Sequence, residues 1–132
     1  MPKSKAIGYI PRKEILSEIK RVEKTEGLKF KRVPKIEIVR RQPSHGHNLV
    51  ERAINPKTGK IESIKRAKVS ITERTTKYTY MTPILLHELR ENLYLQHGLD
   101  KREKEKRKSP SSHRLAQKWW KKDESWGSKH RR

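Results

Sequence analysis

The sequence contains no cysteine. Disulfide bonds and thiolate metal sites are therefore excluded, and any metal ion must be held by histidine and carboxylate side chains. No apolar run is long enough to cross a bilayer, which predicts a protein without a membrane span. The first residues, MPKSKAIGYIPRKE, are basic but lack the apolar segment and the small-residue cleavage site of a secretory signal peptide. We therefore expect a protein that is not secreted by a signal peptide.

Large apolar side chains are also scarce. Leu, Ile, Val and Phe together make up about a fifth of the 132 residues, and there is one phenylalanine. At this level, disorder competes with a packed core for part of the chain. The composition predicts one small domain over residues 11–124, preceded by a basic arm over residues 1–10 and followed by a basic tail over residues 125–132.

Acidic residues are few beside the basic ones: 15 Asp and Glu face 35 Lys and Arg, a net charge of +20. Such a chain repels itself at low salt unless an anion neutralises it. Nucleic acid is the partner that this charge indicates, in the cytoplasm or in a virion or ribonucleoprotein particle. An anionic membrane surface, or the Lys-rich surface of a thermophilic or merely soluble protein, is the alternative. The predicted nucleic-acid-binding residues are Lys101, Arg102, Lys104, Lys106, Arg107, Lys108, Trp126, Arg131 and Arg132.

The first half of the chain predicts one helix and a small sheet. Residues 11–26 place Ile15, Ile19 and Val22 on one helical face, with Gly27 suited to the end of the helix. Segments 35–40 and 67–73 alternate apolar and polar residues and are typical of half-buried strands. Residues 48–54 and 60–65 read as two strands that flank a turn at 55–59. A small antiparallel sheet follows from these four strands.

The second half predicts two helices packed as a hairpin. Over residues 83–97 a leucine stripe recurs at helical spacing, with Thr82 as N-cap, Pro83 at the first helical position and Gly98 beyond the end. Residues 113–124 form a last helix, in which Trp119 and Trp120 are spaced to face a core. The fold class is therefore α+β, with an N-terminal helix, a small antiparallel sheet and a C-terminal helical hairpin.

The helix over residues 83–97 also carries a candidate metal site. His87 and Glu91 are four residues apart, so they share a face and can converge on one ion. Glu88 is turned about the helix axis from His87, where a carboxylate can act as general base on an attacking water. His113 is the candidate third ligand, since the 26 positions after His87 leave room for a helical hairpin. The alternative is that His87 and Glu91 form an ordinary i,i+4 pair and that His113 is a residue at the start of a helix.

The stretches ILLHELRENLYLQHGL and SSHRLAQKWWKKDE resemble a group of small zincin-like proteins of phages, archaeal viruses and integrated elements. That group has a helix with H-E-x-x-E, a glycine that ends it, and an Ala-His-x-x-Ala helix followed by an acidic residue. The resemblance covers about residues 60–124, with Ser112 in place of the group's alanine. It implies that His87, Glu91 and His113 bind zinc, that Glu88 is catalytic and that Glu124 is the trailing acidic residue.

Two functions therefore arise from the sequence. The first is a zincin-like metal-binding protein, in its catalytic form a zinc-dependent metallopeptidase acting on a protein or peptide, on a basic chain associated with nucleic acid. The second is a non-enzymatic nucleic-acid-binding protein of a virion or ribonucleoprotein particle. A second histidine pair, His45 and His47, lies in a predicted loop, where polar turn chemistry is the commoner role than metal ligation.

Overall fold

The structure of the protein is a computed structural model that describes residues 6–40, 46–73, 81–98, 116 and 119–130. Its elements in chain order are β1 (Ala6–Ile10), α1 (Arg12–Glu26), β2 (Lys35–Val39), β3 (Gly46–Ile54), β4 (Ile61–Thr72), α3 (Met81–Gln96) and α6 (Trp120–His130). These helices and strands confirm the predicted α+β class.

The strands form one mixed sheet in the order β1-β2-β4-β3. β1 is antiparallel to β2, and β3 is antiparallel to β4. β2 and β4, however, run parallel, with Ile36 opposite Val69 and Ile38 opposite Ile71. The prediction of a purely antiparallel sheet is therefore wrong at this pair. β4 carries the apolar residues of the hairpin and takes the central position, whereas the more polar β3 takes the edge.

Two further parts of the sheet differ from the prediction. Residues 6–10, expected as part of a basic arm, form β1, in which Ile7 and Tyr9 remain 46% and 53% exposed. The segment is short and these apolar side chains are little buried, so its sequence pattern gives only a weak indication of a strand. Residues 60–65 and 67–73, expected as two strands, belong to the single strand β4. Its pairing with β3 continues through two register shifts, which bulges accommodate.

α1 and α3 begin and end near the predicted residues, whereas α6 begins seven residues and ends six residues later than the helix predicted over residues 113–124. α1 ends as expected at Gly27, which has φ +69° and whose N–H donates to the carbonyl of Glu23. α3 begins at Met81, so Thr82 lies inside the helix and is not its N-cap. α6 continues to His130, so the predicted tail is helical over residues 125–130. Packing of its tryptophans outweighs the low helix propensity of its serines and glycine.

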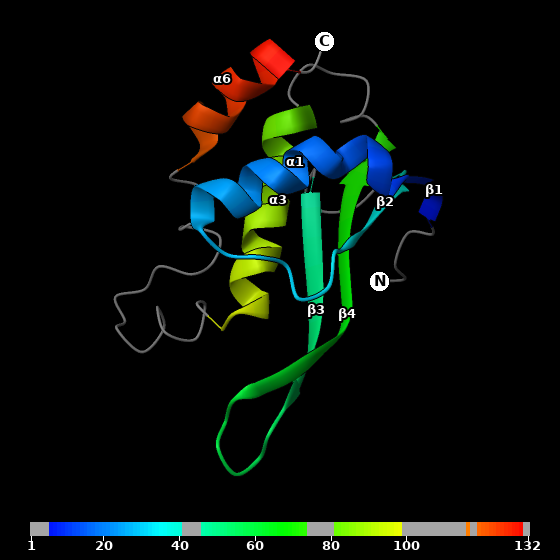
Figure 1. Ribbon diagram of the computed structural model, residues 1–132. Coiled ribbons are helices and arrows are strands. Elements are labelled where there is room, and N and C mark those ends of the chain that lie inside the picture. The colour runs from blue at the N-terminus through cyan, green and yellow to red at the C-terminus, as the bar shows by residue number, and fades with distance from the viewer. Residues whose placement is uncertain (1–5, 41–45, 74–80, 99–115, 117–118, 131–132) are drawn as a thin grey trace.

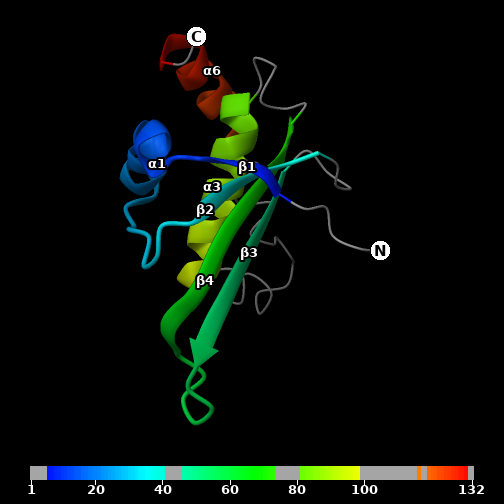
Figure 2. The same ribbon diagram turned by 90° about the vertical axis from the view of Figure 1, so that its right-hand side faces the viewer.

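α3 is the centre of the molecule (Figure 1). It lies against β3 and β4, while α1 crosses it and α6 packs against its N-terminal half (Figures 1 and 2). The core gathers apolar side chains of α1, β2, β4 and α3: Ile15, Ile19, Val22, Ile36, Val69, Ile71, Ile84, Leu85, Leu86, Leu89 and Leu93. No helix in the described part of the chain is long and apolar enough to cross a membrane.

Polar side chains on α3 are buried as well, since neighbours surround this helix. Asn92 donates through Nδ2 to the carbonyls of Leu49 and Lys68, and so ties α3 to β3 and β4. Gln96 accepts from the backbone N–H of Lys31 and Arg32 through Oε1. These amides satisfy backbone groups that the sheet and the loop before β2 leave inside the molecule. Much of the polarity of α3 is therefore structural.

Candidate metal centre

His87 and Glu91 lie side by side near the middle of α3. Nε2 of His87 is 2.7 Å from Oε2 of Glu91, and the two side chains are 6% and 12% exposed. The ring of Trp120, at the start of α6, meets the His87 ring edge to face, with centroids 5.8 Å apart. The i,i+4 spacing thus brings the two predicted ligands together, and α6 shields them from solvent.

Glu88 points toward β3. Its Oε1 accepts a hydrogen bond of 3.0 Å from Nδ2 of Asn48, and the residue is 8% exposed. Gly46, at the start of β3, is what allows this approach. A Cβ at that position would lie 2.7 Å from Cγ and 2.8 Å from Oε2 of Glu88. Strand and helix therefore pack so closely here that glycine is required.

The three side chains form one compact group of ligand atoms. One atom from each of His87, Glu88 and Glu91 lies within 4.8 Å of the others. Two ligand atoms about 2.0–2.1 Å from a tetrahedral zinc ion are about 3.3–3.4 Å apart. The His87–Glu91 distance of 2.7 Å would thus have to open by about 0.6–0.7 Å. Imidazole and carboxylate groups are acceptable zinc ligands, so His87 and Glu91 fit the ion in chemistry, and a small movement of their side chains would bring them to its spacing.

A further polar atom lies beside this group. Oδ1 of Asn48 is buried and has no hydrogen-bond partner among the described residues. A buried amide oxygen without a partner is uncommon and calls for a ligand, a water or an ion. Sequence reasoning missed Asn48, because the β3 segment shows only alternating polarity and Asn48 meets α3 solely through the tertiary fold.

His113, the predicted third ligand, lies outside the described residues. Glu124, which the resemblance makes the trailing acidic residue, is exposed on α6. The buried acidic residue of this helix is its neighbour Asp123, at 1% exposure. Asp123 is therefore the carboxylate of α6 that faces α3. It pairs with an arginine and does not belong to the cluster of His87, Glu88 and Glu91.

That arginine is Arg90, which sequence reasoning also missed. Its Nε and Nη2 donate to Asp123 at 2.8 and 2.7 Å, and Nη1 donates to Glu26 and to Thr25 of α1. Burial lowers the pKa of Arg90, but the hydrogen bonds and charges of Asp123 and Glu26 outweigh this effect and raise it. An arginine inside an apolar run was the available signal, since such a residue needs buried acidic partners.

Tyr94 completes this buried network. Its hydroxyl donates to Oε2 of Glu26 at 2.7 Å. Burial raises the pKa of Tyr94, and the hydrogen bond and negative charge of Glu26 raise it further. The network joins α1, α3 and α6, and so holds the helix that carries Trp120 against His87.

The predicted nucleic-acid-binding residues fall mostly outside the described part of the chain. Trp126, expected as a stacking residue in a tail, instead lies in α6 and packs partly buried against the core. The guanidinium of Arg21 lies 5.8 Å from its ring centroid. His45 lies outside the described residues, and His47 is exposed on β3. Apart from Trp126, the structure describes none of the predicted nucleic-acid-binding residues, which are Lys101, Arg102, Lys104, Lys106, Arg107, Lys108, Arg131 and Arg132.

In comparisons with protein-family models, curated proteins and solved structures, nothing matches this chain.

Proposed function

We propose that this chain is a zincin-like metal-binding protein whose ion is held by His87 and Glu91 of α3 together with His113. The observation that carries the proposal is the cluster of ligand atoms within 4.8 Å on a buried helix. Buried carboxylates beside a histidine are costly unless they bind protons, cations or a metal. The resemblance of the motif to small zincin-like proteins supports zinc and adds His113 to the ligand set.

We propose further that the site hydrolyses peptide bonds, with Glu88 as the general base. Zinc, when bound, supplies Lewis-acid polarisation of the scissile carbonyl. Glu88 would take the proton of the attacking water, and its hydrogen bond from Asn48 holds the carboxylate in place. β3 is an edge strand of the described sheet and lies next to Glu88. An extended peptide can add to such an edge through main-chain hydrogen bonds, which favours a protein or peptide substrate.

Metal analysis of untagged protein, purified without chelator, tests the first proposal. We expect close to one equivalent of zinc, and a large loss of zinc in the His87→Gln and Glu91→Gln variants. The matched control is His47→Gln, because His47 is exposed on β3 and lies outside the cluster. Less than roughly a tenth of an equivalent in the wild-type protein would contradict a bound zinc ion.

The Glu88→Gln variant separates metal binding from catalysis. The amide oxygen of the new side chain can still accept from Asn48, so we expect the fold and the zinc content to persist. Hydrolysis of an unstructured protein substrate should fall by about 10²–10⁴, the usual contribution of a general base. Undiminished hydrolysis in this variant would remove Glu88 as the base, and absence of hydrolysis in the zinc-loaded wild type would leave a structural metal site.

The second candidate function is association with nucleic acid, for which the net charge of +20 is the specific observation. It is compatible with the first, since a metal site can stabilise a small core while the surface binds phosphate. We propose this association as a property of the whole chain. Its affinity should fall steeply with salt, because bound phosphates release counterions.

A further inference from the structure

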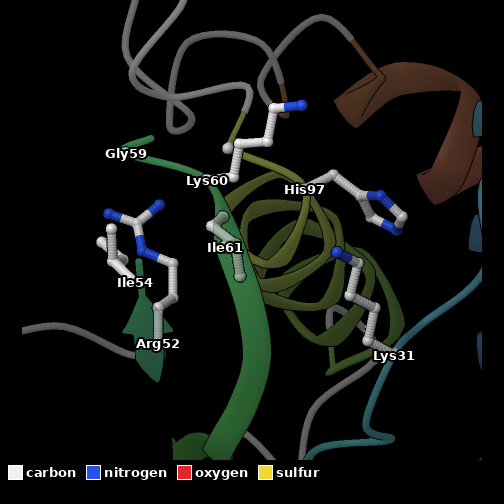
Figure 3. A pocket seen from close by; sticks show the side chains of 8 residues that line it. Lys31, Arg52, Ile54, Gly59, Lys60, Ile61 and His97 are labelled. Carbon is white, nitrogen blue, oxygen red and sulfur yellow. The ribbon is translucent and has the colours of Figure 1, made fainter. Parts of the chain in front are cut away.

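A pocket of about 270 Å³ lies at the far end of α3 from the metal-site cluster. It is formed where the tip of the β3–β4 hairpin meets the last turn of α3 and the loop before β2 (Figure 3). Ten residues separate His87 from His97 on α3, which corresponds to about 15 Å along the helix axis. The pocket is therefore distinct from the candidate metal centre.

The charged side chains among the described lining residues are all basic. Lys31, Arg52 and Lys60 line the pocket together with His97, and no carboxylate is among the described lining residues. Neither Lys31 nor Lys60 forms an ion pair with another described residue. Two acidic residues are adjacent to lining residues in the sequence, and both have other partners. Glu62 accepts from Nδ2 of Asn55 in the hairpin, and Glu51 pairs with Arg66 at 3.5 Å. Cations gathered in a hollow whose described lining holds no carboxylate make a binding site for an anion.

Two of the lining groups are held in place by the fold. Nη1 of Arg52 donates to the carbonyl of Leu95 at 3.1 Å, and Nε2 of His97 lies 2.7 Å from the carbonyl of Lys29. The hairpin turn is fixed too, because Oδ1 of Asn55 accepts from the backbone N–H of Lys57 at 2.8 Å. An anion would therefore meet a largely ordered site, which reduces the entropic cost of binding.

The pocket also has an apolar wall. Ile54, 46% exposed, and Ile61 lie beside Arg52 (Figure 3). An inorganic anion would make no use of this wall, whereas the sugar or base next to a backbone phosphate would cover it. The combination of a cationic hollow with aliphatic side chains, of which Ile54 is exposed and Ile61 half-buried, matches a nucleotide unit of a strand.

We propose that this pocket binds a backbone phosphate of a nucleic-acid strand, with Lys31, Arg52 and Lys60 as its cationic ligands. The inference rests on the association with nucleic acid proposed above and assigns it a place on the described fold. It does not depend on the metal site, because His87, Glu88 and Glu91 are not among the residues that line the pocket.

Fluorescence anisotropy with a labelled single-stranded oligonucleotide, titrated at several NaCl concentrations, tests the site. The double variant Lys31→Gln/Lys60→Gln removes two exposed pocket cations. Its control, Lys13→Gln/Lys24→Gln, removes two exposed lysines of α1 and so changes the net charge equally. If both pocket lysines contact phosphate, the slope of log K against log [NaCl] should become shallower by about 1.4. The affinity near 0.1 M salt should fall roughly tenfold. The control should keep the wild-type slope and nearly the wild-type affinity.

The remaining outcomes separate this inference from the association itself. Absence of wild-type binding at low salt overturns both proposals. If the wild type binds and the pocket and control variants weaken binding equally, the pocket proposal is overturned but the association with nucleic acid stands. The positive charge would then act without a defined site. Competition by inorganic phosphate, compared with chloride at the same ionic strength, identifies the chemistry: it should weaken oligonucleotide binding to the wild type and have little effect on the pocket variant. Equal competition in both proteins contradicts a phosphate site in the pocket.

Discussion

At the scale of single residues, Gly46 sets the distance between β3 and α3. Gly46→Ala would place a methyl group 2.7 Å from Cγ of Glu88 and 3.0 Å from Cγ2 of Ile84. We expect a loss of about 1–3 kcal/mol in the free energy of unfolding, the usual cost of overpacking, measured by urea denaturation. Gly8→Ala is the control, because no atom lies within 4 Å of the added Cβ. Equal stability of the two variants would contradict this close packing.

The hydroxyl of Tyr94 gives a prediction for pH. Because its pKa is raised in the folded protein, the stabilisation is complete below the unfolded pKa of 10.0 and is lost as the pH rises above it. The Tyr94→Phe variant should have a lower free energy of unfolding than the wild type. This difference should be constant between about pH 7 and 9 and shrink above about pH 10. Chemical denaturation across this range measures it. The exposed Tyr9→Phe serves as control, and a Tyr94→Phe deficit that grew above pH 10 would contradict the sign.

At the scale of elements, Arg90 joins α3 to both other helices. Arg90→Met would remove the cation bonded to Glu26 and would leave the buried carboxylate of Asp123 with only Arg21, at 3.5 Å. We expect a loss of about 3–5 kcal/mol in the free energy of unfolding. The control is Arg66→Met, whose ion pair with Glu51 is 56% and 50% exposed and should contribute less than about 1 kcal/mol.

The same network makes the metal site depend on helix packing. Trp120 covers His87 only while α6 stays on α3, and Asp123 of α6 is held by Arg90. Urea denaturation of Arg90→Met and Arg66→Met measures the difference between the buried and the exposed arginine. Similar losses in the two variants would show that the network adds little to the docking of these helices.

At the scale of the whole molecule, the net charge of +20 governs the response to salt. The Debye length falls from about 30 Å at 0.01 M to about 8 Å at 0.15 M, so added salt screens the self-repulsion of the chain. Salt also weakens exposed ion pairs, but each of these contributes only about 0–1 kcal/mol. We therefore expect the thermal midpoint to rise between these concentrations of NaCl, as followed by circular dichroism.

The charge-reduced variant Lys13→Gln/Lys24→Gln provides the comparison for this prediction. With two positive charges fewer, its thermal midpoint should rise less with salt than that of the wild type. A wild-type midpoint that falls with added salt would mean that attractive pairs, and not net repulsion, dominate the electrostatics of the folded chain.

The sequence by itself determined the features that depend on local periodicity. Helical spacing predicted α1 and the central part of α3, and the alternation of residues 35–40 predicted β2 (Lys35–Val39). It also predicted that His87 and Glu91 would meet, because residues four apart share one helical face. The glycines at the ends of these helices followed from their tolerance of positive φ. Each of these inferences needed only neighbours within a few positions of the chain.

The tertiary structure alone decided which distant segments meet. The parallel pairing of β2 with β4, the pairing of β1 with β2 and the contact of Glu88 with Asn48 all join residues far apart in the chain. Asp123 rather than Glu124 faces α3 for the same reason, since helix rotation is set by packing against Arg90 and the core. These contacts depend on which side chains are buried against one another. Burial is a property of the assembled fold and cannot be derived from the spacing of residues in the sequence.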